Sequence, residues 1–107
     1  MTFLAQESSF ELAASLRDLV RRLARTDRDL SQQIRRATTS AALNLAEGNG
    51  RSGMDRLRCF RIARGSALEV QAGLRLAVAW GYVEDERVRR PLAVVDELLR
   101  MLGGLLR

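Results

Sequence analysis

The sequence RRATTSAALNLAEGNGR, residues 35–51, carries the most informative helical pattern of the chain. Arg36, Ser40, Asn44 and Glu47 recur at steps of four, four and three, so they lie on one face of the expected helix. A face that only meets water usually carries long charged side chains. A stripe of one cation, one hydroxyl, one amide and one carboxylate therefore indicates a more specific role for this face.

Apolar residues recur at steps of three and four on both sides of this stretch, as they do in amphipathic helices. The expected helices begin near residues 8, 26, 52 and 84, and they end near residues 25, 48, 80 and 102. Short connections between helices with narrow apolar stripes are typical of bundles. We therefore predict an all-α fold, an antiparallel up-down-up-down four-helix bundle that forms a single domain over residues 1–107.

Local signals add three expectations to this helical pattern. Ser8 and Glu11 have the spacing of a capping box, which predicts the start of the first helix. Gly65 and Gly73 lie inside the third helix, where a glycine costs about 1 kcal/mol relative to alanine and suggests close approach of a neighbouring backbone. Pro91 either kinks the fourth helix or marks a restart of it.

Charge is distributed unevenly along the 107 residues, which are 47% hydrophobic and carry a net charge of +5. All 18 basic residues are arginines. The segment 21–64 contains 11 arginines and four acidic residues, a net charge of +7, so the rest of the chain carries −2. A basic middle segment favours a polyanion or an acidic partner, although a solvated surface with local ion pairs explains the same charges.

The predicted helix faces supply two sets of candidate residues. A buried charge needs a partner, so Arg36 with Glu69, or Arg64 with Glu47, is expected to pair across the second and third helices. The predicted polar network, which sets helix register and assembly, consists of Arg36, Ser40, Asn44, Glu47, Arg64, Ser66 and Glu69. The rival interpretation turns arginines outward to phosphate, and the nucleic-acid-binding candidates are Arg35, Arg51, Arg56, Arg58 and Arg61.

The residue types present argue against catalysis. Histidine is absent, so no Ser–His pair, no Cys–His pair and no Glu-x-x-His motif of a di-iron bundle can form. Cys59 is the only cysteine, which excludes an internal disulfide and predicts a small buried thiol. We expect no catalytic, cofactor or metal site, no membrane segment, and a soluble protein of the reducing cytoplasm.

A second apolar surface is expected on the third helix. The residues that lie off its main apolar stripe are Leu68, Leu76, Val78 and Trp80. A helix that is apolar on two sides is either central in its bundle or lies at a subunit interface. The pattern therefore favours oligomerisation.

Two groups of residues carry a family resemblance within residues 32–83. The first group is Gln33, Arg36, Ala37, Ser40, Asn44, Ala46, Glu47, Gly48 and Arg51. The second group is Phe60, Ala63, Gly65, Ser66 and Glu69. The first group resembles the pattern Q-x-x-R-A-x-x-S-x-x-x-N-I-A-E-G-x-x-R, with Leu45 in place of isoleucine. Both are similar to a bacterial four-helix bundle family, the 23S rRNA-intervening sequence proteins, whose genes were first noticed inside intervening sequences of large-subunit ribosomal RNA genes.

The resemblance implies an antiparallel bundle that assembles with itself as a ring, typically a pentamer. More distant relatives are accessory proteins to reverse transcriptases of diversity-generating retroelements, and they bind nucleic acid through a basic surface. The residues and the resemblance together predict a non-enzymatic, basic homo-oligomer that binds RNA or DNA. The alternative is a scaffold for a protein partner such as a reverse transcriptase or a ribosomal factor.

Overall fold

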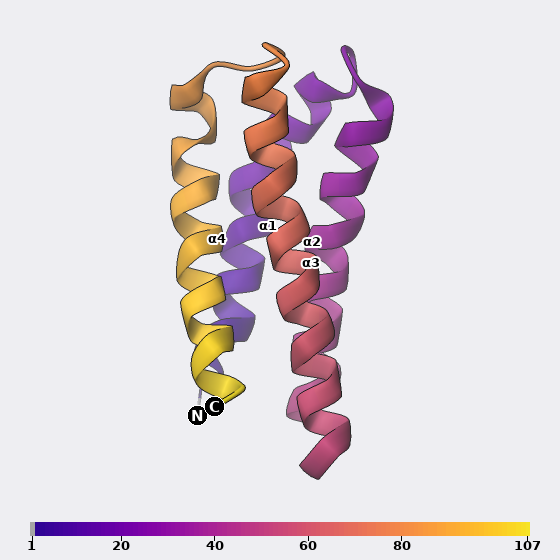
Figure 1. The fold of residues 1–107 in the computed structure, drawn as a ribbon, viewed down its shortest axis with the longest axis vertical. Coiled ribbons are helices and arrows are strands. Elements are labelled where there is room, and N and C mark those ends of the chain that lie inside the picture. Colours follow the sequence, from indigo (N-terminus) through magenta and orange to yellow (C-terminus); the bar gives the residue numbers. More distant parts are fainter. Residues whose placement is uncertain (1) are drawn as a thin grey trace.

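The computed structural model describes residues 2–107 and contains four α-helices and no strand within them. The helices are α1 (Leu4–Leu23), α2 (Arg28–Asn49), α3 (Gly53–Ala79) and α4 (Asp85–Leu105). They lie side by side along the long axis of a molecule that measures 43 × 22 × 20 Å, and both termini lie at the same end (Figure 1). The predicted all-α class and the four helices are confirmed.

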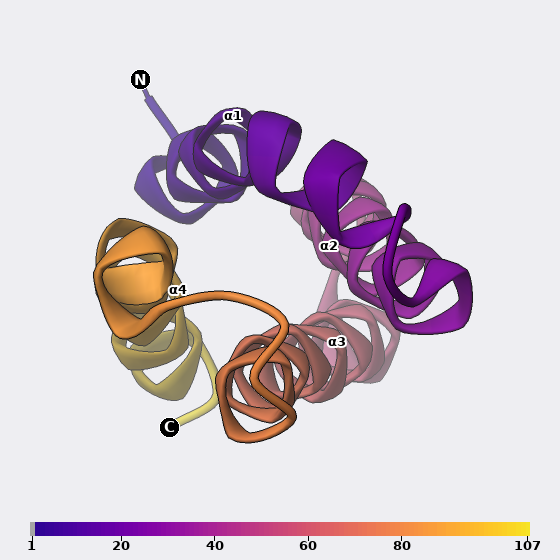
Figure 2. The same cartoon turned by 90° about the horizontal axis from the view of Figure 1, so that it is seen from above.

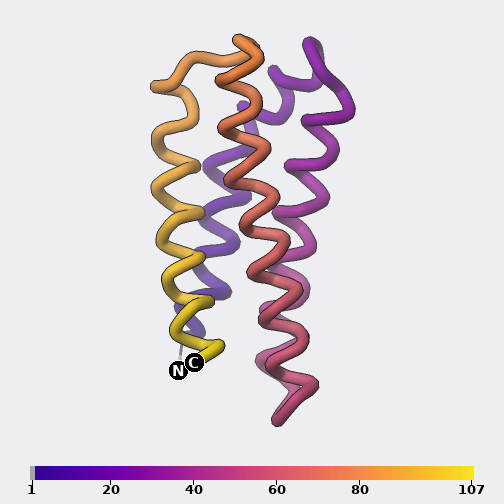
Figure 3. Tube along the Cα trace, in the orientation of Figure 1, coloured from indigo at the N-terminus to yellow at the C-terminus, as the bar shows by residue number. Residues whose placement is uncertain are grey.

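Each helix contacts two neighbours around a shared interior. α2 packs against α1 and α3, and α4 packs against the same two helices. Seen along the long axis, the four helices surround the interior (Figure 2). The α2–α3 pair makes the most extensive contact. In Figure 3 the lower end of the α2–α3 pair, where residues 50–52 connect the two helices, extends further down than the chain termini.

The core is built from the apolar stripes of all four helices. Its largest fully buried side chains include Leu12, Leu23, Ile34, Leu45, Phe60, Leu74, Leu98 and Leu102. Burial of one such side chain contributes about 1.5–3 kcal/mol relative to leaving it exposed. Cys59 is also buried, as the sequence predicted.

The start of α1 differs from the prediction. The helix begins at Leu4 and Ser8 is buried inside it, so the predicted capping box of Ser8 and Glu11 is wrong. Gln6 Nε2 donates a hydrogen bond to the carbonyl oxygen of Ala42 in α2 at 3.0 Å. This contact holds the first turn of α1 against α2, and packing therefore extends the helix beyond the point that its local sequence indicates.

The other helix starts agree more closely with the sequence. α2 begins after Asp27, whose carboxylate accepts a hydrogen bond from the amide of Leu30 at 3.0 Å, as expected of an N-cap. Pro91 is buried inside α4, and the helix continues on both sides of it, so of the two alternatives, a kink or a restart, the restart does not occur.

Two glycines allow α2 and α3 to approach closely. A Cβ atom on Gly73 would lie 2.7 Å from Ile34 Cγ1, and a Cβ atom on Gly48 would lie 2.7 Å from Phe60 Cε1. Neither distance leaves room for a methyl group. A Cβ atom on Gly65 would meet nothing within 4 Å. The helices pack tightly at Gly73, but against the side chain of Ile34 and not against the predicted backbone, and the prediction is wrong at Gly65 within the protomer.

We predict that Gly48→Ala lowers the free energy of unfolding by about 1–3 kcal/mol, the usual cost of overpacking a core. The added methyl group would collide with the ring of Phe60, which is 1% exposed and has no free space to move into. Urea denaturation followed by circular dichroism measures the change.

Gly103→Ala in α4 is the matched control, because a Cβ atom there meets nothing within 4 Å. Its stability should be unchanged or higher, since alanine has the higher helix propensity. Equal stability of the two variants would contradict the close packing of α2 on α3.

Candidate functional site

The middle of the polar stripe forms one hydrogen bond between α2 and α3, next to hydrogen bonds within α2. Ser66 Oγ donates to Ser40 Oγ at 2.8 Å, and Asn44 Nδ2 donates to the carbonyl oxygen of Ser40 at 2.9 Å. Ser66 is buried, whereas Ser40 and Asn44 are half-buried. The structure thus brings together the three residues of the predicted network that have short uncharged side chains.

The charged members of the predicted network lie at the edge of this seam. They are all exposed: Arg36, Glu47, Arg64 and Glu69. Neither predicted cross-helix pair, Arg36 with Glu69 or Arg64 with Glu47, forms within residues 2–107. Glu47 instead pairs with Arg51, one turn further along α2, at 3.0 Å. The two helices are too close to hold long side chains between them, so the charged groups remain in water and need no buried partner.

Apolar side chains are left uncovered beside the same seam. The exposed fractions are 64% for Leu43, 42% for Ile62 and 48% for Leu76. Leu76 and Glu69 border a hollow of about 140 Å³ between α2 and α3. Ile62, Glu69 and Leu76 follow one another at steps of seven along α3, as Arg36 and Leu43 do along α2. We call the surface formed by these five residues the α2–α3 face.

The remaining residues that were expected off the main stripe of α3 have different surroundings. Leu68 and Trp80 are exposed, whereas Val78 packs against the core. Trp80 stacks on Tyr82, with 6.5 Å between the ring centroids. Desolvation and, second, the nearby Asp27 carboxylate raise the pKa of Tyr82 above its ordinary value.

At the α2–α3 connection, two of the candidate arginines have partners within the chain. Arg51 pairs with Glu47, and Arg56 Nη1 donates to the carbonyl oxygen of Arg51 at 3.4 Å. The Arg56 guanidinium also lies over the buried ring of Phe60, 5.4 Å from the ring centre. A hollow of about 260 Å³ is lined by Arg51 and Arg58, but also by Glu47 and Asp55. The charges of this end of the molecule are therefore largely balanced.

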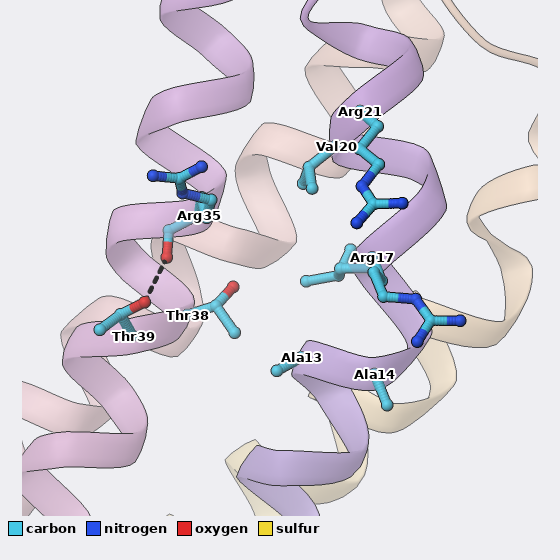
Figure 4. A pocket seen from close by; sticks show the side chains of 9 residues that line it. Ala13, Ala14, Arg17, Val20, Arg21, Arg35, Thr38 and Thr39 are labelled. Carbon is cyan, nitrogen blue, oxygen red and sulfur yellow. Dashed lines mark hydrogen bonds between the residues drawn. The ribbon is translucent and has the colours of Figure 1, made fainter.

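Of the two remaining candidates, Arg61 is exposed on α3 and Arg35 lines a groove between α1 and α2 (Figure 4). The groove consists of two adjoining hollows of about 470 and 360 Å³, which share Val20, Arg21 and Arg35. No acidic residue lines either hollow. We call this the α1–α2 groove and define it by its four arginines, Arg17, Arg21, Arg28 and Arg35.

The three hydroxyl groups that line the groove all donate to backbone carbonyl oxygens. Thr39 Oγ1 donates to the carbonyl oxygen of Arg35 at 3.0 Å (Figure 4). Thr38 Oγ1 donates to the carbonyl oxygen of Ile34 at 2.8 Å. Ser31 Oγ donates to the carbonyl oxygen of Val20 in α1 at 2.6 Å. The guanidinium groups along the rims are therefore the main donors that a ligand can meet.

Sequence reasoning did not single out three of the groove arginines, Arg17, Arg21 and Arg28. Two of them lie in the basic segment 21–64, but a charge count along the chain does not show which side chains share a groove. Helix phase could have grouped them within each helix, although it does not show that the two pairs border one groove. Arg17 and Arg21 are four residues apart on α1, and Arg28 and Arg35 are seven apart on α2, so each pair shares a face.

The described residues offer neither a metal-binding cluster nor a membrane-spanning helix. Between residues 2 and 107, no three His, Cys, Asp or Glu side chains gather in a way that would hold a metal ion. None of the four helices has a stretch long and apolar enough to cross a bilayer. The expected lack of a catalytic or cofactor site stays a prediction.

Comparisons with known proteins place this architecture in a family. The family model described as 23S rRNA-intervening sequence protein matches residues 2–104. No curated protein matches the chain. The crystal structure of a protein with unknown function from the S23 ribosomal protein family of Bacteroides thetaiotaomicron is similar, with a TM-score of 0.86 and 22% identity over 96% of this chain and 98% of that chain. That likeness shows the same fold. Because the family model spans nearly the whole chain, the protein belongs to the 23S rRNA-intervening sequence protein family.

Proposed function

We propose that this protein is a non-enzymatic, basic homo-oligomer that binds RNA or DNA through arginine side chains on its surface. One observation carries the proposal. Within residues 2–107 the arginines that take part in ion pairs are Arg17, Arg51, Arg90 and Arg100, although the chain has 18 arginines. Guanidinium groups without carboxylate partners match phosphate groups in charge and geometry. The net charge of +5 adds a long-range attraction to polyanions.

The proposed unit of assembly is the antiparallel up-down-up-down bundle. Two observations support this topology. The connections between the helices are short, at residues 24–27, 50–52 and 80–84, and α1 is in contact with α4. Short connections favour antiparallel neighbours.

The proposed assembly is a ring of copies, a pentamer, that meet through the α2–α3 face. Leu43, Ile62 and Leu76 are exposed there, and Arg36 and Glu69 carry opposite charges with no ion pair inside residues 2–107. Apolar side chains and complementary charges of this kind are typical of subunit interfaces. Five copies of a +5 chain would carry +25, which would strengthen the attraction to nucleic acid.

A second candidate function is a scaffold for a protein partner, such as a reverse transcriptase or a ribosomal factor. It is favoured by exposed apolar side chains outside the α2–α3 face, since Leu4 is 65% and Phe10 is 54% exposed on α1. Capture of partners from lysate with and without nuclease separates the two functions, because nuclease-resistant partners favour the scaffold.

We predict that the protein binds fluorescein-labelled RNA or DNA with an affinity that falls at least about tenfold between about 50 and about 200 mM salt. The reason is that each arginine on a phosphate releases a condensed counterion. Fluorescence anisotropy measures the affinity at each salt concentration. No binding even at the lowest salt concentration would exclude the proposed nucleic-acid function.

We predict that Glu69→Ala lowers the native mass of the assembly without unfolding the protomer. Glu69 is exposed and forms no ion pair within residues 2–107, so the protomer itself does not need its carboxylate. Size-exclusion chromatography with light scattering measures the mass, and circular dichroism measures the thermal midpoint.

Glu86→Ala on α4 is the control for that experiment, because it removes one exposed carboxylate from another helix. It should leave the mass of the assembly as it is in the parent protein. A parent protein that is monomeric, or a Glu69→Ala variant with unchanged mass and midpoint, would contradict the proposed role of the α2–α3 face.

A further inference from the structure

We propose that the α1–α2 groove binds the sugar–phosphate backbone of the nucleic acid and makes no base-specific contact. The inference rests on the proposed nucleic-acid binding, and it adds the surface, the residues and the mode of contact. Arg17 and Arg21 belong to α1, and Arg28 and Arg35 belong to α2, so both helices that form the groove contribute arginine residues to its lining. The two hollows adjoin, so these groups belong to one continuous groove.

The groove arginines are the least compensated cationic cluster among the hollows described above. No carboxylate lines the groove. Arg17 Nε lies 3.8 Å from Asp18 Oδ1, but the two side chains are 73% and 82% exposed. Such a surface ion pair contributes little to stability. Arg21, Arg28 and Arg35 form no ion pair within the described chain, residues 2–107. A phosphate in the groove would therefore displace no internal partner of these three arginines.

The α2–α3 connection, by contrast, is a poorer phosphate site than the sequence predicted. Arg51 already pairs with Glu47, and the hollow that Arg58 lines also contains Asp55. A phosphate there would have to compete with one carboxylate and would be repelled by the other. In the α1–α2 groove a phosphate would meet neither obstacle, because no carboxylate lines it.

The spacing of the groove arginines suits a chain of phosphates better than a single ion. Arg17 and Arg21 are one helical turn apart, about 6 Å along the axis, and Arg28 and Arg35 are separated by about 10 Å. The four arginine positions are therefore spread along the rims of the groove instead of forming one cluster. Each planar guanidinium can donate two parallel hydrogen bonds to a phosphate.

The floor of the groove offers little to a base. Ala13, Leu16 and Val20 are apolar, and the side chains of Thr38 and Thr39 use their hydroxyl protons on backbone carbonyl oxygens. None of the groove's lining residues is aromatic, so the groove has no stacking platform of the kind used to hold unpaired bases. Contact to phosphates positions a nucleic acid but does not read its sequence.

The test compares the parent protein with the double variant Arg21→Ala/Arg35→Ala, because these two arginines line both hollows. The probes are a fluorescein-labelled RNA strand and a labelled DNA duplex of the same length, which distinguish single-stranded from duplex sources of the same backbone. At low salt the affinity of the double variant should fall about tenfold or more, since two charge-assisted contacts are lost. The plot of log affinity against log salt should become less steep by about 1.4 for the strand or about 1.8 for the duplex, as expected for two phosphates.

Arg75→Ala/Arg89→Ala is the matched control, because it removes the same charge from exposed positions of α3 and α4 outside the groove. Its affinity should stay within about twofold of the parent, since screening by salt weakens distant charges. Native mass and circular dichroism should be the same for both double variants and the parent. Two RNA strands of equal length and different sequence should bind the parent with equal affinity.

Three results would overturn the inference while leaving nucleic-acid binding intact. They are parent-like affinity of the groove variant, equal losses in both double variants, and a strong preference between the two RNA sequences. A changed native mass of the groove variant would also overturn it, because the groove would then join copies of the chain. A parent protein that binds neither probe would instead refute the proposed function itself.

Discussion

The close approach of α2 to α3 is the constraint on which the arrangement of the other side chains depends. Gly48 and Gly73 lie where a methyl group would collide with a buried side chain of the facing helix. At this separation the hydroxyl groups of Ser40 and Ser66 can reach each other at 2.8 Å. Larger residues at the glycine positions would move the helices apart and lengthen that hydrogen bond, because cores are too densely packed to absorb extra atoms.

The same closeness decides where the charges lie. Short polar side chains meet at the middle of the seam, and Arg36 and Glu69 lie at its edge, where they are exposed to water and open to a partner outside the protomer. α1 packs less extensively on α2 than α3 does. Small side chains such as Ala13 and Ala14 line the space between α1 and α2, and that space is the arginine-lined groove. The narrow seam and the open groove are thus two consequences of unequal packing around one helix, α2.

Apolar spacing was sufficient to predict the four helices, because burial of a stripe at steps of three and four is what stabilises a bundle. The break before α2 was also predictable, since Asp27 has the local chemistry of an N-cap. The start of α1 was not, because Ser8 resembles a cap in sequence and is buried only through packing against other helices. Local chemistry predicts a boundary when the cap is made by neighbours in sequence, and fails when tertiary contacts extend the helix.

For the candidate site, helix phase predicted directions but not distances. It placed Ser40, Asn44 and Ser66 on facing stripes, and these residues do form hydrogen bonds. It also paired Arg36 with Glu69, because phase alone does not show that the helices are too close for long side chains. The groove depends on the rotation of α1 relative to α2, which no pattern within either helix contains.

A shared fold does not explain the groove arginines. A bundle of this kind is held together by apolar stripes and small residues, whereas exposed side chains usually change stability by no more than about 0.5 kcal/mol. Four guanidinium groups around one groove without a carboxylate repel each other, so packing gives no reason to gather them there. Stability does not require this cluster and electrostatic repulsion opposes it, and the phosphates of the proposed ligand would balance its charge. The fold provides the scaffold, and the exposed arginines on it determine what the scaffold binds.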